Sequence, residues 1–292
     1  MRAQSSPNGV GSPRSRPDEQ ASSAAAGFTN VVRLEVVDST NRYAADAVRQ
    51  GAPEGLVVVA AEQTAGRGRL GRAWVAPKGT ALLCSLVFRP RLRVDELHLV
   101  VTAVALAAAD AAQETGGVRI DLKWPNDLVA GDDKVGGILA EVVADRSGRQ
   151  ATSALVVGVG VNLGASELRI RLATDSSRHG PVSVTGLTEL SGRAVACDDV
   201  LAAMLRSLAG RYGAQRRPDP STMDEYRRRC VTIGESVRVD AMGRSFSGLA
   251  RGIDDSGRLL VETAGGRLTL DAADVVHLRE IRRRASRGNW NP

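Results

Sequence analysis

The sequence predicts an α+β protein in which a central mixed β-sheet, flanked by helices, is followed by a small β-barrel. Between residues 31 and 230, apolar runs of strand length alternate with longer segments rich in Ala, Val and Leu. From residue 231 the chain changes to short strands joined by glycine-containing turns, of which "DDSG" (254–257) and "AGG" (264–266) are the clearest. A length of 292 residues is enough for one large and one small domain.

We expect four segments: a disordered tail over 1–30, a larger domain over 31–230, the barrel over 231–280 and a basic disordered tail over 281–292. The first segment is rich in Ser, Pro, Gly and Arg and has no apolar core of a signal peptide. No apolar run reaches the roughly 18 residues of a membrane-spanning helix. The three cysteines are far apart, which suits reduced thiols. We therefore expect a cytoplasmic protein.

The first elements follow from apolar periodicity and from residues that stop helices. "VVRLEVV" predicts a strand over 31–37, and "RYAADAVRQG" predicts a helix that begins near Ser39 or Thr40 and stops at Gly51. "GLVVVAAEQ" is apolar almost throughout, which predicts a strand over 55–63 that is buried on both faces. A further strand ends at Pro90.

The later elements of the larger domain are predicted in the same way. A long helix covers 95–114, and "VRIDLKWPNDLV" predicts a strand that runs into a turn at Pro125. Residues 134–145 and 151–163 predict a pair of strands with Gly148 in the turn between them. Residues 164–183 are polar and irregular, and two or three helices fill 184–230, interrupted by "RRPDPS".

The stretch "TAGRGRLGRAW" (64–74) contains the G-x-G-x-x-G spacing of a dinucleotide-binding turn. Such a turn needs a following helix and an acidic residue about 20 positions further on. Pro77 and Gly79 oppose a helix here, and the later region reads "LVFRPR", without an acid. A phosphate-binding Walker loop is excluded too, because no G-K-[ST] follows. The dinucleotide interpretation is therefore rejected.

Three arginines are interleaved with the glycines of this loop: Arg67, Arg69 and Arg72. The glycines allow the backbone to approach an anion, and the arginines add fixed charge and bidentate donors. Unpaired arginines repel one another, so we expect the free loop to be disordered and a bound polyanion to order it.

Five stretches in fixed order resemble the biotin protein ligases: "DSTN" (38–41), "EQTAGRGRLGRAW" (62–74), "KWPNDL" (123–128), "KVGGILAE" (134–141) and "GVGVNL" (158–163). The resemblance extends over about 31–278. It implies the class II synthetase-like fold of biotin and lipoate ligases with an SH3-like C-terminal barrel. It also implies two half-reactions: biotin and ATP give biotinyl-5′-AMP and pyrophosphate, and a lysine of a biotin carboxyl carrier domain of a carboxylase then displaces AMP.

The resemblance also implies roles for charged residues, since a biotin carboxylate must approach the anionic triphosphate. The implied catalytic residues are Lys134, Arg69, Arg67, Lys123 and Asp127. In the family, the lysine matching Lys134 contacts the biotin carboxyl and the α-phosphate. Asp127 either holds Mg²⁺ with the phosphates or orients the incoming amine. Mg²⁺ is expected to arrive with ATP, because the histidines and cysteines form no cluster for a protein-bound metal.

The remaining implied ligands are mostly neutral. The implied biotin-binding residues are Ser39, Thr40, Asn41, Gln63, Arg67, Gly68, Arg69, Lys134, Gly136, Gly158 and Gly160. The implied ATP-binding residues are Arg69, Arg72, Trp74, Lys123, Asn126 and Asn162, with Asn162 reading adenine and Trp74 stacking on it. The arginine loop is expected to act as charge clamp and lid over the adenylate. In the irregular segment, 181–184 is the part we expect to cover the nucleotide.

Alternatives remain open at this point. A lipoate-protein ligase of the same superfamily would use the same architecture, and a non-catalytic biotin sensor would bind biotin without releasing pyrophosphate. A nucleic-acid-binding role for the barrel and basic tail is opposed by the single aromatic residue of the barrel, Phe246. No DNA partner is expected, since the first 30 residues cannot fold a winged helix. No membrane partner is expected either, since no apolar run is long enough to cross a bilayer. Homodimer formation is left open.

Overall fold

The computed structural model describes residues 27–144, 154–165, 183–213, 216–219, 221–241, 244–271 and 274–277. Several expectations lie outside the described residues: the tail up to residue 26, the turn at Gly148, most of the irregular segment before residue 183, and the basic tail.

The larger domain is built on a seven-stranded mixed sheet, as the sequence predicts. Its strand order is β1-β2-β3-β7-β6-β5-β4. The β1–β2 pair is parallel and the other pairs are antiparallel. The strands are β1 (Asn30–Val37), β2 (Leu56–Gln63), β3 (Ala81–Phe88), β4 (Asp121–Lys123), β5 (Asp127–Ala130), β6 (Asp133–Val143) and β7 (Ala154–Asn162).

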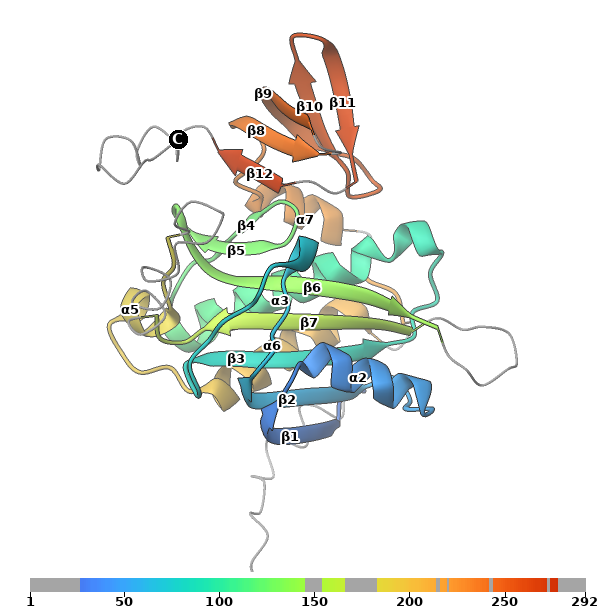
Figure 1. Ribbon diagram of the computed structural model, residues 1–292, viewed down its shortest axis with the longest axis vertical. Helices are drawn as coiled ribbons and strands as arrows, with labels where there is room; N and C mark the ends of the chain where they lie inside the picture. The colour runs from blue at the N-terminus through green and yellow to red at the C-terminus, as the bar shows by residue number, and fades with distance from the viewer. Residues whose placement is uncertain are drawn as a thin grey trace, which may run out of the picture.

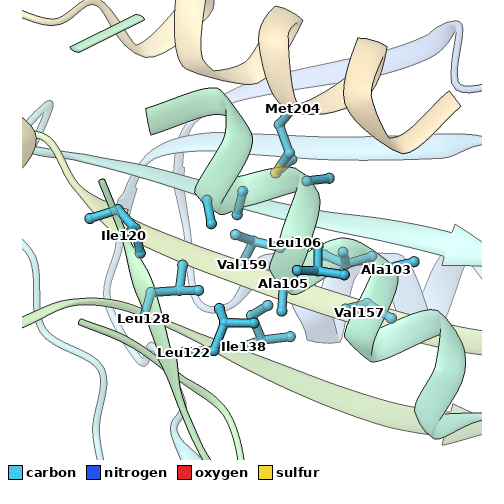
Figure 2. Close-up of a cluster of buried hydrophobic side chains, with 14 of the residues drawn as sticks. Ala103, Ala105, Leu106, Ile120, Leu122, Leu128, Ile138, Val157, Val159 and Met204 are labelled. Carbon is cyan, nitrogen blue, oxygen red and sulfur yellow. The ribbon is translucent and has the colours of Figure 1, made fainter. Parts of the chain in front are cut away.

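Helices lie on both faces of this sheet, as Figure 1 shows. On one face α2 (Thr40–Arg49) crosses β2, β3 and β7. The other face is covered by α3 (His98–Gly116), α5 (Leu187–Ser191), α6 (Cys197–Tyr212) and α7 (Thr222–Arg229). The core between α3, α6 and the sheet is aliphatic, with Leu106, Val159 and Met204 at its centre (Figure 2). The small side chains of α3 allow this helix to lie close to the strands.

Two helix boundaries are informative. The first helix begins at Thr40 with Ser39 as an extended N-cap, and Gly51 (φ 93°) follows its last turn, so both predicted end signals are confirmed. The long helix begins at His98, three residues later than predicted, because Val94–Glu96 forms a separate 3₁₀ turn. In the described part of the chain, no helix has the length and apolar character needed to cross a membrane.

The C-terminal barrel is a five-stranded antiparallel sheet of order β11-β10-β9-β8-β12. Its strands are β8 (Ser236–Ala241), β9 (Arg244–Ile253), β10 (Leu259–Thr263), β11 (Gly266–Leu270) and β12 (Asp274–His277). Buried barrel residues such as Val237, Val239 and Val261 belong to the same contiguous apolar cluster as the core of the larger domain. The barrel is therefore packed directly onto the larger domain beside α7 (Figure 1).

An ionic cluster fastens the helical layer. The Asp110 carboxylate on α3 accepts hydrogen bonds from Ser207 (2.7 Å) and Arg211 (2.7 Å) on α6 and from Arg229 (2.8 Å) on α7. Arg211 also pairs with Glu225 at 2.7 Å. Burial alone would raise the pKa of Asp110, but the hydrogen bonds from Ser207, Arg229 and Arg211 outweigh it, so the pKa is lowered from 3.8. The pKa of Glu225 is lowered from 4.5, chiefly by its hydrogen bond from Arg211.

These lowered pKa values predict acid sensitivity of the fold. A carboxylate whose folded-state pKa is depressed contributes stability that is present above its unfolded pKa and is lost as the pH falls through the folded one. The loss should begin below about pH 4.5 and continue below 3.8. Asp110→Asn should lower the free energy of unfolding by about 1–3 kcal/mol at pH 7. Urea unfolding at pH 7 and pH 3.5 should show a smaller difference for this variant than for the wild type.

The matched control for this prediction is Asp46→Asn, which removes an exposed carboxylate on α2 that pairs with Arg49. An exposed pair of this kind contributes little. The control should therefore keep the wild-type difference between the two pH values, and the interpretation fails if Asp110→Asn behaves in the same way.

Candidate active site

The two faces of the sheet differ in chemistry. Along β7, Val157, Val159 and Val161 belong to the helix-covered core. The alternate residues Gly158, Gly160 and Asn162 point to the opposite side, which we call the α2 face because α2 lies on it. The arginine loop also crosses this face, over β6. Bare glycine backbone on this side leaves room for groups that lie flat on the sheet.

A buried cluster of neutral polar groups lies where α2 begins. Ser39, Thr40 and Asn41 are 3%, 4% and 3% exposed, although all three are polar. The side-chain oxygen Oε1 of Gln63, at the end of β2, accepts hydrogen bonds from the Thr40 backbone amide (2.7 Å) and the Thr40 hydroxyl (3.1 Å). The Ser85 hydroxyl of β3 lies 2.8 Å from Thr40 Oγ1. The structure thus brings the predicted neutral ligands together and adds Ser85 to them.

Both side-chain N–H donors of Asn41 are used by protein partners. Its Oδ1 accepts from Ser85 Oγ (2.6 Å), and its Nδ2 donates to Leu139 O (3.1 Å) and to Glu141 Oε2 (2.8 Å). The amide lies directly over Gly158, where a Cβ atom would be 2.2 Å from Asn41 Oδ1. An amide has two N–H donors, and both are used here. Asn41 therefore positions its neighbours, and its contact with biotin stays a prediction.

The arginine loop is a folded hairpin in this structure. Gly68 N donates to Arg72 O (2.7 Å), Trp74 N donates to Gly66 O (2.9 Å), and Arg69–Gly71 forms a 3₁₀ turn. The expectation that the free loop is disordered and that a bound polyanion orders it stays a prediction. In the folded form seen here, protein groups relieve part of the repulsion between the arginines.

Two loop arginines have identified partners on the sheet. Arg67 Nη2 lies 2.9 Å from Glu141 Oε2, the same oxygen that accepts from Asn41. Arg69 Nη1 donates to Asn126 Oδ1 at 3.3 Å. Between the loop and β6 lies an open depression of about 310 Å³, lined by Arg67, Gly68, Arg69, Leu70, Gly71, Arg72, Leu139 and Glu141. The loop therefore forms one wall of a basic depression.

Lys134 is held rigidly at the start of β6. Its backbone bonds to Ser183 O and to Thr185 N, both at 2.9 Å. Its Nζ lies 2.5 Å from Asp127 Oδ1 and 5.7 Å from the centre of the Trp74 ring. Lys123 pairs in register with Asp127 across β4 and β5, so it lies on the same face. Ser183, the last residue of the irregular segment 164–183, therefore lies beside this lysine.

Trp74 lies on the glycine track of the α2 face. A Cβ atom on Gly160 would be 2.6 Å from the indole ring, and one on Gly137 would be 3.5 Å from it. The Trp74 Nε1 donor is buried without a partner, and so is the Oδ1 acceptor of Asn162, although Asn162 Nδ2 donates to Thr185 O (3.1 Å). Unsatisfied buried polar atoms are rare in native proteins and point to a missing partner.

Gly136 is the predicted residue that the structure does not bring to this face. It pairs with Val161 and Leu128, whose side chains belong to the helix-covered core. An irregularity in the β5–β6 register makes Val135 an extra residue between Lys134 and Gly136. One extra residue reverses the alternation of the strand, so Gly136 faces away from Lys134.

The cysteines do not take part in this site. All three are free thiols. Burial raises the pKa of Cys84, Cys197 and Cys230, so the thiols stay protonated and are poor nucleophiles.

Sequence reasoning missed Ser85 and Glu141 as site residues. Ser85 is the one polar residue of the strand "ALLCSLVF" and is fully buried, which is a signal that the sequence does carry. Glu141 closes the motif "KVGGILAE", but nothing in the sequence indicates that it lies between Asn41 and Arg67.

Glu141→Gln should weaken biotin binding by about 2–5-fold, because the pair with Arg67 is partly exposed and solvent screens it. The amide oxygen of glutamine would still accept from Asn41, so only the charge opposite Arg67 is removed. Isothermal titration with biotin measures the effect. The control is Glu35→Gln, which removes an exposed carboxylate on β1 that pairs with Lys78. This variant should bind biotin as tightly as the wild type does. If Glu141→Gln binds biotin as tightly as Glu35→Gln does, the ion pair between Glu141 and Arg67 does not contribute to biotin binding.

Comparison with known families adds to this geometry. Residues 34–162 match the Biotin/lipoate A/B protein ligase family, and residues 232–278 match the Biotin protein ligase C terminal domain. The first match covers the sheet residues of the site, and the second covers most of the barrel.

Two curated relatives are named biotin--[acetyl-CoA-carboxylase] ligase. The one from Mycobacterium tuberculosis is 34% identical over 256 residues, which span 85% of this chain and 90% of the relative. The one from Paracoccus denitrificans is 36% identical over 250 residues, which span 83% and 98%. A biotin protein ligase from Aquifex aeolicus, solved with biotin and ATP, shares the fold with a TM-score of 0.70 and 24% identity, over 86% of this chain and 100% of that one.

Proposed function

The chain belongs to the biotin protein ligase family, and from that premise we propose that its α2 face forms biotinyl-5′-AMP from biotin and ATP and then passes the biotinyl group to a lysine of a carrier domain. The observation that carries the proposal is the juxtaposition of a buried neutral cluster with a group of cations. The neutral cluster suits the uncharged ureido ring of biotin. The cations suit its carboxylate and the phosphates of ATP: Arg67, Arg69, Arg72, Lys123 and Lys134.

Biotin is proposed to lie between the start of α2 and the glycine track. Ser39, Thr40 and Gln63 supply hydroxyl and amide groups for the ureido ring. Asn41, Ser85 and Glu141 hold these ligands and Arg67 in place. Gly158 and Gly160 keep the sheet low beneath the ring system, and Gly68 gives the loop the close approach to it.

In the first half-reaction a carboxylate oxygen of biotin attacks the α-phosphorus of ATP, and the bond to pyrophosphate breaks. The obstacle is repulsion between two anions, which fixed cations in a partly dry site reduce. Lys134 is proposed to stabilise the charge that develops on the carboxylate and α-phosphate oxygens. Arg69, Arg72 and Lys123 are proposed to bind the phosphates, with Asn126 holding Arg69.

The adenine base is proposed to lie near Asn162. The unsatisfied Oδ1 of Asn162 is an acceptor that suits the exocyclic amine of adenine. Trp74 offers an indole face for stacking and a donor that lacks a partner.

In the second half-reaction the neutral amine of the carrier lysine attacks the acyl carbon, and AMP leaves. Asp127 is proposed either to orient this amine or to contact Mg²⁺ that is bound to ATP. Among the described residues no group of three or more His, Cys, Asp or Glu could hold a metal ion. The donor set therefore fits Mg²⁺ that keeps most of its ligands from phosphates and water, and its chemistry would be to neutralise phosphate charge.

The partner follows from the proposed reaction. The carrier domain of an acetyl-CoA or related carboxylase would present its lysine to the basic depression beneath the loop. We propose that the reaction takes place in the cytoplasm, where ATP is available. Self-association is tested by sedimentation with and without biotinyl-5′-AMP.

Biotin-dependent release of pyrophosphate from ATP tests the proposal. The wild type should release pyrophosphate with biotin and transfer labelled biotin to a carrier domain. Pyrophosphate release with lipoate but not with biotin would indicate a lipoate-protein ligase. Binding of biotin without pyrophosphate release would indicate a sensor. Either of these two results would overturn the proposed function.

A further inference from the structure

Two side-chain amides at the start of α2 have orientations that their partners fix. Asn41 Nδ2 donates to Leu139 O (3.1 Å) and to Glu141 Oε2 (2.8 Å), and both of these oxygens only accept. Gln63 Oε1 accepts from the backbone N–H of Thr40 at 2.7 Å. Turning the first amide over would set its oxygen against two acceptors, and turning the second would set its NH₂ group against an N–H. The oxygens Asn41 Oδ1 and Gln63 Oε1 are therefore both acceptors.

Two hydroxyl groups lie between these two oxygens and connect them by three contacts. Ser85 Oγ lies 2.6 Å from Asn41 Oδ1 and 2.8 Å from Thr40 Oγ1. Thr40 Oγ1 lies 3.1 Å from Gln63 Oε1. Each hydroxyl brings one proton, and an amide oxygen brings none. Three contacts therefore share two protons, and this group of side chains is one proton short.

The distances show which contact lacks a full proton. Asn41 Oδ1 cannot donate, so Ser85 donates its proton across the shortest contact, at 2.6 Å. Ser85 then has no proton left for Thr40, and the Thr40 hydroxyl must serve two acceptors with one proton. Its stronger hydrogen bond goes to Ser85 at 2.8 Å and its weaker one to Gln63 at 3.1 Å. The proton is therefore missing between the oxygens of Thr40 and Gln63.

Burial makes this shortage count. Ser85 is 0% exposed and Thr40 is 4% exposed, so water does not complete their hydrogen bonds from the solvent side. A ligand N–H placed between the Thr40 and Gln63 oxygens would donate to both of them and supply the missing proton. A cyclic urea carries such ring N–H groups beside its carbonyl, whereas a dithiolane ring carries none. The shortage therefore favours a cyclic urea.

The same helix end holds another hydroxyl that helix formation does not use. Ser39 is the N-cap of α2, a position at which a serine side chain ordinarily accepts from an amide of the first turn. Here Ser39 makes no side-chain cap hydrogen bond, although the residue is only 3% exposed. This nearly buried hydroxyl thus remains for a ligand that lies against Thr40 and Gln63.

We propose that Ser85 is a positioning residue that makes this site selective for cyclic ureas. By donating to Asn41 and accepting from Thr40, it draws the Thr40 proton away from Gln63. The Thr40 and Gln63 oxygens together then accept a ring N–H of the ligand. The inference deepens the proposed function and rests on it, because that ring is the ureido ring of biotin. Ser85 acts through Thr40 and does not touch the ligand.

The test is a double-mutant cycle on the dissociation constant of biotin, measured by titration calorimetry. Ser85→Ala lets the Thr40 proton turn fully to Gln63, so the constant should rise on the order of 2–10-fold, the effect of one hydrogen bond. Thr40→Val removes the hydroxyl that Ser85 orients, and it should weaken binding by a similar factor. In the Thr40→Val background, Ser85→Ala should change the constant by less than about twofold.

Thr102→Val is the matched control, since it removes another buried hydroxyl and keeps the shape of the side chain. Thr102 lies on α3, on the other side of the sheet; it is 7% exposed, and its Oγ1 lies 3.6 Å from Met223 Sδ. This variant should bind biotin within about twofold of the wild type. A Ser85→Ala protein that binds as tightly as Thr102→Val would overturn the proposal. Losses that multiply in the double variant of Ser85 and Thr40 would overturn it too.

Ethylene urea, the cyclic urea without an acid chain, separates this inference from the proposed function. Its ability to compete with biotin should weaken in Ser85→Ala by the same factor as biotin binding. If the wild type binds both ligands but releases no pyrophosphate, the proposed function fails and the cycle still decides the role of Ser85. If the wild type releases pyrophosphate but the cycle shows no coupling, the function stands and the inference fails.

Two remaining results also decide the matter. If the wild type binds neither biotin nor ethylene urea, the function and the inference both fail. If Ser85→Ala does not fold, Ser85→Cys takes its place in the cycle, since a thiol of similar size is a weaker donor and acceptor. Its dissociation constant for biotin should rise by a smaller factor, and an unchanged constant would overturn the proposal.

Discussion

Lys134→Ala is expected to reduce biotin-dependent pyrophosphate release by about 10²–10³-fold, the effect of removing one positioned donor from a developing negative charge. The side chain is 25% exposed and is held by Asp127, so its ammonium is directed before substrates bind. Steady-state assays with saturating biotin and ATP measure the effect, and thermal unfolding checks that the fold is kept.

Lys78→Ala provides the comparison for this variant. Lys78 is 56% exposed and pairs with Glu35 away from the α2 face. Its removal should leave the rate within about twofold of the wild type, since exposed ion pairs contribute little. A Lys134→Ala enzyme that works as well as Lys78→Ala would remove Lys134 from the mechanism.

Gly158→Ala is expected to weaken biotin binding by roughly 10–100-fold, because the new methyl group would displace the Asn41 amide and break at least two of its hydrogen bonds. The predicted separation of 2.2 Å from Asn41 Oδ1 is too short for any real contact. The same change should lower the free energy of unfolding by about 1–3 kcal/mol. Titration calorimetry and urea unfolding measure the two effects.

Two further variants test whether the effect of Gly158→Ala comes from a collision with Asn41. Gly252→Ala adds a methyl group to a strand of the barrel where nothing lies within 4 Å, so its effect should stay within about 0.5 kcal/mol. Shortening the opposing side chain, in Gly158→Ala with Asn41→Ser, should recover part of the lost stability. Additive losses in the double variant would show that the two positions do not collide.

Much of the fold could be predicted because strand and helix periodicities are local properties. The apolar run of β2 and the antiparallel β6–β7 pair are confirmed as predicted. The start of α3 was wrong by three residues, because Val94–Glu96 closes its own 3₁₀ turn before the helix begins. Local sequence does not distinguish such a turn from the first turn of the helix.

The site could be predicted less completely. The motifs identified residues that the structure does gather on the α2 face. They could not show that the Asn41 side chain is hydrogen-bonded to Ser85 and Glu141. These two residues lie 44 and 100 positions further along the chain, on other strands. Nor could they show that Gly136 faces the helix-covered core, because a single extra residue in β6 is visible only in the pairing of the strands.

The unsatisfied oxygen of Asn162 has a consequence for discrimination between nucleotides. A buried acceptor gains most from a base that brings an N–H group, and it penalises a base that brings a second acceptor to the same point. Replacement of the adenine amine by the carbonyl of hypoxanthine would set two oxygens against each other. The enzyme should therefore prefer ATP to ITP, and Asn162→Ala should narrow that preference by weakening the use of ATP.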